Sequence, residues 1–336
     1  MNTNIRVISV LRGLAALMVC LYHFICSPLI TDNSILSFFE FGKKGVQIFF
    51  IISGIVIPLS MIGMEYSINK MVQFLKVRFI RVEPPYLIAV LFGVLYLNVR
   101  NYIPTSSSID VSPTVKEILL HIGYLIPFFE GTRWVSNVFW TLSVEFQYYL
   151  FVALLLPFFL NKKDIFRHFF VLVLLSCPIF TIYLTDDINI RYRFFPFWSS
   201  YFGIGIVYAF YITKRIHMFH FFIYSFFLFS IVIICQGFVD FLIALFIILT
   251  IHFFKNFTFK LGEFFGNISY SLYLVHTFTG LAFINLMTKM AVNPFGKFVL
   301  EIIALCFTIL FSYFFWKYVE RPSQHFSRNF KNKLSR

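Results

Sequence analysis

Charged residues are scarce in this sequence of 336 residues. Asp, Glu, Lys and Arg make up 13% of it, whereas soluble globular domains carry about 25%. Hydrophobic residues reach 59%, the mean hydropathy is +0.82, and long apolar runs recur along the whole chain. The shortage of charge excludes an ordinary soluble domain, and the recurring runs indicate a protein that crosses a membrane several times.

The signatures of several enzyme classes are missing as well. The sequence contains no GxSxG, HExxH, GxGxxG or P-loop motif, and its histidines lack the spacing of metal ligands. Its five cysteines form no CxxC pair and lie in or beside apolar segments, where we expect them to pack as small residues. We therefore expect neither a metal centre nor a disulfide framework.

Acidic residues are the rarer charge, with 15 Asp and Glu against 28 Lys and Arg and a net charge of +13. When the N-terminus is placed in the cytoplasm, twice as many lysines and arginines fall in cytoplasmic segments as in outer ones. The positive-inside rule then accounts for the basic surplus, with both termini inside and without a nucleic-acid partner. The basic tail ERPSQHFSRNFKNKLSR is expected to contact anionic membrane lipids.

A helix needs about 20 apolar residues to cross a bilayer, and ten windows meet this requirement. They are residues 5–27, 43–63, 84–103, 137–160, 168–185, 194–213, 217–236, 238–254, 268–290 and 296–318. A weaker stretch, 117–130, is interrupted by Pro127 and is predicted to be partly embedded or re-entrant. The sequence thus predicts an all-α polytopic membrane helix bundle of about ten transmembrane helices, N-in and C-in. We expect one domain over residues 1–336, without an appended soluble domain.

Within the first window, Arg12 and His23 lie eleven residues apart. Eleven residues make about three helical turns, so both side chains face the same way, roughly 16 Å apart. Ionisable groups are costly inside a bilayer, and an aligned pair therefore suggests a buried functional track. The alternative for His23 is a histidine packed in the core.

Glu145 lies inside the fourth window, in FWTLSVEFQYYLF, at a depth where a carboxylate needs a partner or a water-filled cavity. A carboxylate that accepts a proton from an imidazole fixes the tautomer of the ring, so Glu145 is a candidate to orient His23. The alternative is a structural ion pair between helices.

Two further sets of polar residues accompany this pair. Arg78 and Arg81, three apart in KVRFIRVEPPY, have guanidinium groups that suit phosphate oxygens, although they could instead serve only to hold a loop on the cytoplasmic side. In GNISYSLYLVHTF, a stripe of hydrogen-bonding groups is expected on one side of a helix, either along a passage or as packing between helices: Ser269, Tyr270, Tyr273 and His276. Ser53 and Gly54 are interpreted as packing residues.

These segments, in this order, resemble the acyltransferase-3 family of integral-membrane acyltransferases. The matching motifs are Arg12-x10-His23, GVQIFFIISGIVI (45–57), Arg78-x-x-Arg81, FWTLSVEFQYYL (139–150) and GNISYSLYLVH (266–276), and the closing YVERP (318–322) is also similar to the family's ending. Gln47 stands in the second motif where an acid is commoner, so it is not expected to be catalytic.

The resemblance implies a cytoplasmic acyl-CoA donor, usually acetyl-CoA, and an extracytoplasmic glycan acceptor. By their motif positions, Arg12, Arg78 and Arg81 are expected to bind the donor, and His23 and Glu145 to be catalytic. Five residues are expected to line the substrate path or support it: Ser143, Ser269, Tyr270, Tyr273 and His276. The compact length resembles the members that O-acetylate lipid-linked or polymeric O-antigen (lipopolysaccharide) in the inner membrane of enteric bacteria, including those encoded by their phages.

The resulting hypothesis is acetyl transfer across the membrane, with His23 either carrying the acetyl group or acting as base for a sugar hydroxyl. One alternative is an acyltransferase that acts on another glycan or on a small molecule. The other is a transporter or flippase of lipid-linked sugars. The two arginine motifs, without the interrupted half-helices typical of transporters, favour the acyltransferase.

Overall fold

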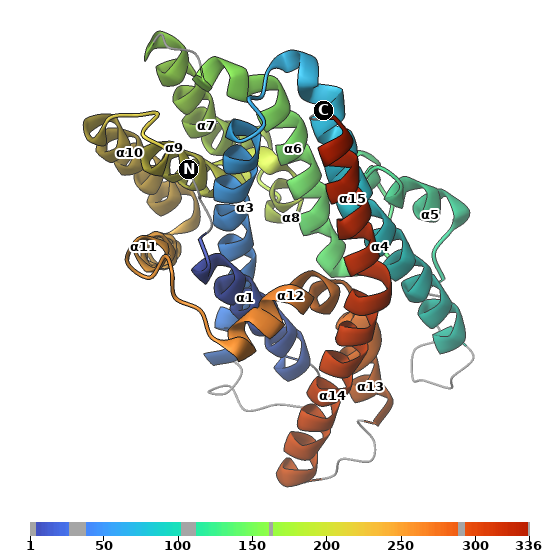
Figure 1. The fold of residues 1–336 in the computed structure, drawn as a ribbon. Helices are drawn as coiled ribbons and strands as arrows, with labels where there is room; N and C mark the ends of the chain where they lie inside the picture. The colour runs from blue at the N-terminus through green and yellow to red at the C-terminus, as the bar shows by residue number, and fades with distance from the viewer. Residues whose placement is uncertain (1–4, 27–37, 102–111, 161–163, 288–292, 335–336) are drawn as a thin grey trace.

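The computed structural model describes residues 5–26, 38–101, 112–160, 164–287 and 293–334 (Figure 1). Of the residues that it describes, 86% are helical and none lies in a strand. The helices are α1 Val7–Ile25, α3 Gly45–Ile62, α4 Met71–Asn101, α5 Val115–His121, α6 Trp140–Leu160, α7 Asp164–Leu184, α8 Ile188–Tyr192, α9 Phe195–Ile212, α10 Met218–Gln236, α11 Phe238–Phe253, α12 Lys260–Val275, α13 Ala282–Met287, α14 Pro294–Phe315 and α15 Arg321–Leu334.

The predicted all-α membrane bundle is confirmed. Within the described residues, eight helical stretches are long and apolar enough to cross a membrane. Two predicted windows contain shorter apolar helices instead: 238–254 holds α11, of 16 residues, and 268–290 holds the end of α12, a π-helical turn (Thr277–Leu281) and α13. The count of ten and the N-in orientation remain predictions.

The main core is built around α9, whose residues 197–210 are all buried. A helix that is apolar on every side is stable only when other helices surround it, and α3, α7 and α10 pack directly on α9. Glycines let α3 and α9 approach closely, because a Cβ on Gly54 would lie 2.3 Å from the backbone oxygen of Phe202. The packing prediction for Gly54 therefore agrees with the structure.

Two regions differ from the predicted windows. The α4 helix begins at Met71 rather than at residue 84, so it includes Arg78 and Arg81. It continues without a break through Pro84 and Pro85. The α14 helix continues through a second π-helical turn, Trp316–Glu320, into α15. One face of α15 packs along α4, as Figure 1 shows, so the basic tail is part of the bundle wall.

The weaker stretch 117–130 folds as α5 followed by a 3-10 turn at Ile126–Phe128. Thr114 and Glu117 form a capping box at the start of α5, and Glu117 also accepts hydrogen bonds from the backbone and side-chain nitrogens of Arg133. Burial would raise the pKa of Glu117, but these hydrogen bonds outweigh it and hold the pKa below its ordinary value. Beyond α5, the ring of Tyr124 stacks on Tyr86 of α4.

Candidate active site

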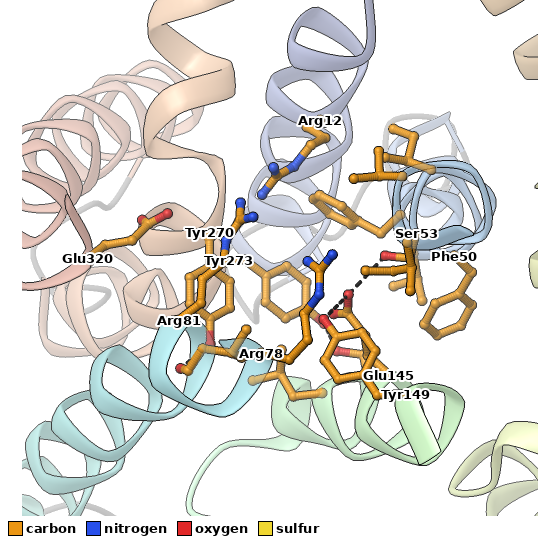
Figure 2. A pocket seen from close by; sticks show the side chains of 18 of the residues that line it. Arg12, Phe50, Ser53, Arg78, Arg81, Glu145, Tyr149, Tyr270, Tyr273 and Glu320 are labelled. Carbon is orange, nitrogen blue, oxygen red and sulfur yellow. Dashed lines mark hydrogen bonds between the residues drawn. The ribbon is translucent and has the colours of Figure 1, made fainter. Parts of the chain in front are cut away.

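A cavity of about 110 Å³ lies among α1, α3, α4, α6, α12 and the junction of α14 with α15 (Figure 2). Six of the predicted site residues line it: Arg12, Arg78, Arg81, Glu145, Tyr270 and Tyr273. Segments far apart in the sequence thus bring most of the predicted polar groups to one place. The structure places the remaining predicted residues behind its walls or beyond one end.

Three arginines face the cavity, Arg12 from α1 and Arg78 and Arg81 from α4 (Figure 2). In the part of the chain that the structure describes, none of the three forms an ion pair with a carboxylate. The guanidinium of Arg78 lies 5.6 Å from the ring centre of Phe74 and 5.9 Å from that of Tyr149, so aromatic faces hold it. Three cations turned toward one cavity without a paired carboxylate make a site for an anion.

Glu145 lines the cavity from α6. Its Oε1 accepts hydrogen bonds from Ser53 Oγ at 2.9 Å and from Tyr149 Oη at 2.7 Å. Figure 2 shows this carboxylate near Arg78. The structure therefore pairs Glu145 with Ser53 and Tyr149, and not with His23 as the sequence suggested. Ser53 is a site residue that we had interpreted only as packing.

The end of the cavity away from the arginines is less polar. Phe49 and Tyr273 meet there edge to face, with ring centres 5.8 Å apart, and Tyr273 Oη lies 2.7 Å from Thr141 Oγ1. Behind Tyr273 lies His276, whose ring centre is 6.0 Å from that of Tyr273 and 5.2 Å from that of His23. Both histidines thus lie just beyond the cavity, past Tyr273.

His276 is fully buried, and its tautomer follows from its contacts. Its Nδ1 lies 2.9 Å from the carbonyl oxygen of Tyr273 and 3.2 Å from that of Leu272. Carbonyls only accept hydrogen bonds, so Nδ1 carries the proton and Nε2 is left with a lone pair. Among the described residues that Nε2 has no hydrogen-bond partner. The π-helical turn begins directly after His276, and such turns are frequent at functional sites.

A wider vestibule of about 640 Å³ adjoins the arginine end of the cavity and shares Arg12, Arg81, Glu320 and Gln324 with it. It adds polar groups from the starts of α1 and α12: Arg6, Ser9, Glu263 and Asn267. The cavity is therefore entered from the side where α1, α4 and α12 begin and α3 ends.

Glu320 was missed by the sequence analysis. It is 2% exposed and accepts hydrogen bonds from Ser271 N (3.1 Å), Ser271 Oγ (2.5 Å) and Gln324 Nε2 (2.6 Å). Its carboxylate sits near Arg12 and Arg81 without an ion-pairing distance to either. A carboxylate within the otherwise basic tail, inside the motif YVERP, was the available signal.

Two predicted residues support the walls rather than line the cavity. Ser143 donates to the carbonyl of Tyr124 and connects α6 to the segment after α5, and Ser269 donates to the carbonyl of Gly266 within its own helix.

Gln47 does not line the cavity. It and Tyr201 donate to Asp240, which forms a 2.6 Å ion pair with Lys44. The described residues hold no group of three or more His, Cys, Asp or Glu that could bind a metal.

Together, the bundle and the cavity define a multi-pass membrane protein with a buried cavity lined by three arginines and two carboxylates. Residues 5–317 match the family model described as an acyltransferase domain. The chain belongs to the acyltransferase-3 family and is a membrane acyltransferase. No curated protein and no solved structure matches it at a significant level.

Proposed function

We propose that this protein is an O-acetyltransferase of a bacterial inner membrane. It moves an acetyl group from cytoplasmic acetyl-CoA to a sugar hydroxyl of an extracytoplasmic glycan, and the motif resemblance favours lipid-linked O-antigen as the acceptor. One observation carries the proposal: a cavity leads from three arginines without paired carboxylates to Tyr273, and the His23–His276 pair lies directly behind that ring.

The shape of the donor fits this cavity. Coenzyme A carries its phosphates at one end and its acyl thioester at the other, joined by a long flexible arm. The lining residues of α3 extend from Val46 to Ile57, eleven residue steps or roughly 16 Å of helix. With the N-terminus in the cytoplasm, the phosphates enter through the vestibule and bind the arginines, and the thioester lies toward Tyr273. A cavity of about 110 Å³ suits a short acyl group better than a fatty chain.

The chemistry then occurs at the histidine end. The hydroxyl oxygen of the sugar forms a bond to the acyl carbon, the carbon–sulfur bond breaks, and the hydroxyl proton passes through His23 to the departing thiolate. In the second version, a nitrogen of His23 first bonds to the acyl carbon as the carbon–sulfur bond breaks, and the thiolate takes up the proton that the imidazole loses. The hydroxyl oxygen then bonds to the acyl carbon, the nitrogen–carbon bond breaks, and the hydroxyl proton returns to the imidazole. Both versions need His23 beside the thioester and need water to be kept away, which burial in the bundle provides.

The test uses the full-length protein in liposomes, radiolabelled acetyl-CoA and an O-antigen acceptor. We expect label in the glycan with the wild type and none with His23→Ala, while insertion and thermal stability stay unchanged. His252→Ala, an exposed histidine on α11 away from the cavity, is the matched control and should transfer normally. Full transfer by His23→Ala would exclude His23 as the catalyst. Movement of lipid-linked sugar without consumption of acetyl-CoA would favour the transporter instead.

A further inference from the structure

The helix that carries two of the arginines contains a double proline. Pro84 and Pro85 lie inside α4, one turn after Arg81. In an α-helix each backbone N–H donates to the carbonyl four residues earlier, and proline has no N–H. The carbonyls of Ile80 and Arg81 therefore lose their helical donors. Both belong to the turn that places Arg78 and Arg81 at the cavity.

A serine on α15 replaces these donors. Ser323 Oγ lies 2.6 Å from the carbonyl oxygen of Ile80 and 3.1 Å from that of Arg81. A hydroxyl has one proton, so the two carbonyls share it, with the shorter bond to Ile80. Ser323 is 8% exposed, so water does not readily take its place. One turn further along, Ser327 donates to the carbonyl of Val77 at 2.7 Å.

The same stretch of chain also reaches the cavity itself. Gln324, the neighbour of Ser323, lines both the cavity and the vestibule and donates to Glu320. The backbone of the arginine turn and one wall of the cavity are thus fixed by one element, α15. Prolines inside a helix are common sites of kinks, so the turn without these hydrogen bonds would be free to bend.

We propose that Ser323 is a positioning residue for donor binding: it caps the carbonyls left open by Pro84 and Pro85 and so holds Arg78 and Arg81 at the angle that the phosphates of the donor require. The inference rests on the proposed function, since it takes the arginines to bind coenzyme A. The basic tail then affects the affinity for the acyl donor in addition to any contact with lipid.

The first test is binding of coenzyme A to the purified full-length protein, measured by titration calorimetry, together with KM and kcat for acetyl-CoA. Ser323→Ala should weaken binding about threefold to tenfold, the effect of one hydrogen bond, and raise KM while kcat changes little. Ser323→Thr keeps the hydroxyl and should restore affinity. Ser199→Ala is the matched control, because Ser199 is also buried and donates at 2.9 Å to the carbonyl of Leu174 on another helix, away from the cavity. It should lower thermal stability to a similar degree and leave affinity unchanged.

The second test removes the need for Ser323. The double substitution Pro84→Ala and Pro85→Ala restores the two N–H groups, which can then donate to Ile80 and Arg81 within the helix. In that background, Ser323→Ala should change affinity by less than about twofold. An unchanged affinity of Ser323→Ala in the natural background, or an undiminished loss in the proline-free one, would overturn the inference alone. If the wild type failed to bind coenzyme A, the proposed donor and this inference would both fall.

Discussion

The contact between α3 and α9 predicts how much a side chain added to Gly54 destabilises the protein. A Cβ added to Gly54 would lie 2.3 Å from the backbone oxygen of Phe202, whereas ordinary contacts begin at 3.4 Å. Backbone atoms cannot rotate away as a side chain can, so Gly54→Ala must push the two helices about 1 Å apart. Overpacking of this kind costs about 1–3 kcal/mol. Because the neighbouring Ser53 holds Glu145, a displacement of about 1 Å should also reduce acyl transfer by up to about 100-fold.

The assay compares Gly54→Ala with Gly63→Ala, at a second glycine that caps the C-terminal end of α3, outside the contact with α9. A Cβ on Gly63 meets no atom closer than 3.5 Å, and its φ of −67° is accessible to alanine, so that substitution should be neutral or slightly stabilising. Thermal unfolding in detergent and the rate of acyl transfer are measured for both variants. An unfolding temperature of Gly54→Ala equal to that of the wild type would refute the packing argument.

Two further predictions concern single hydrogen-bonded groups. Tyr149→Phe removes the 2.7 Å bond to Glu145 but keeps the ring beside Arg78. Because Glu145 lies toward the arginines, KM for acetyl-CoA should rise about threefold to tenfold while kcat changes little; an unchanged KM would show that the ring, not the hydroxyl, matters. Glu117→Gln should lower stability by about 1 kcal/mol at pH 7. The pKa of Glu117 is held low in the folded state, so this difference should shrink as the pH falls below the ordinary carboxylate range near about 4.3, and thermal unfolding between neutral and acidic pH would measure it. A difference that persisted unchanged in acid would contradict that assignment.

Composition and motif spacing were enough to predict the helical membrane bundle and six of the polar residues that line the cavity. Arg12, Arg78 and Arg81 meet as expected because each sits at a fixed place on a helix, and helix periodicity sets the face on which a side chain appears. What the sequence could not show was the start of α4. Proline usually ends or kinks a helix, yet α4 continues through Pro84 and Pro85, and Ser323, more than 200 residues away, donates to the carbonyls that they leave open.

The sequence also failed to show the hydrogen-bond partners of the buried carboxylates, because these partners include residues of other helices. The depth of Glu145 in its helix was visible in the sequence, but its choice between Ser53, Tyr149 and His23 depends on how α1, α3 and α6 are rotated against one another. Glu320 depends likewise on Ser271 of another helix, and on a π-helical turn that no hydrophobic pattern announces.

The two ends of the cavity therefore have different chemistries. Every carboxylate that lines it, Glu145 and Glu320, lies toward the arginines, where negative charge offsets the guanidinium groups. Beyond the other end, the ring of His276 lies beside that of His23. Two carbonyls fix the proton of His276 on Nδ1, and its Nε2 has no hydrogen-bond partner among the described residues. A neutral imidazole can accept a proton without holding a fixed negative charge in the bundle, which a carboxylate in that place could not do. The His23–His276 pair thus takes the position that the sequence had assigned to a glutamate and a histidine.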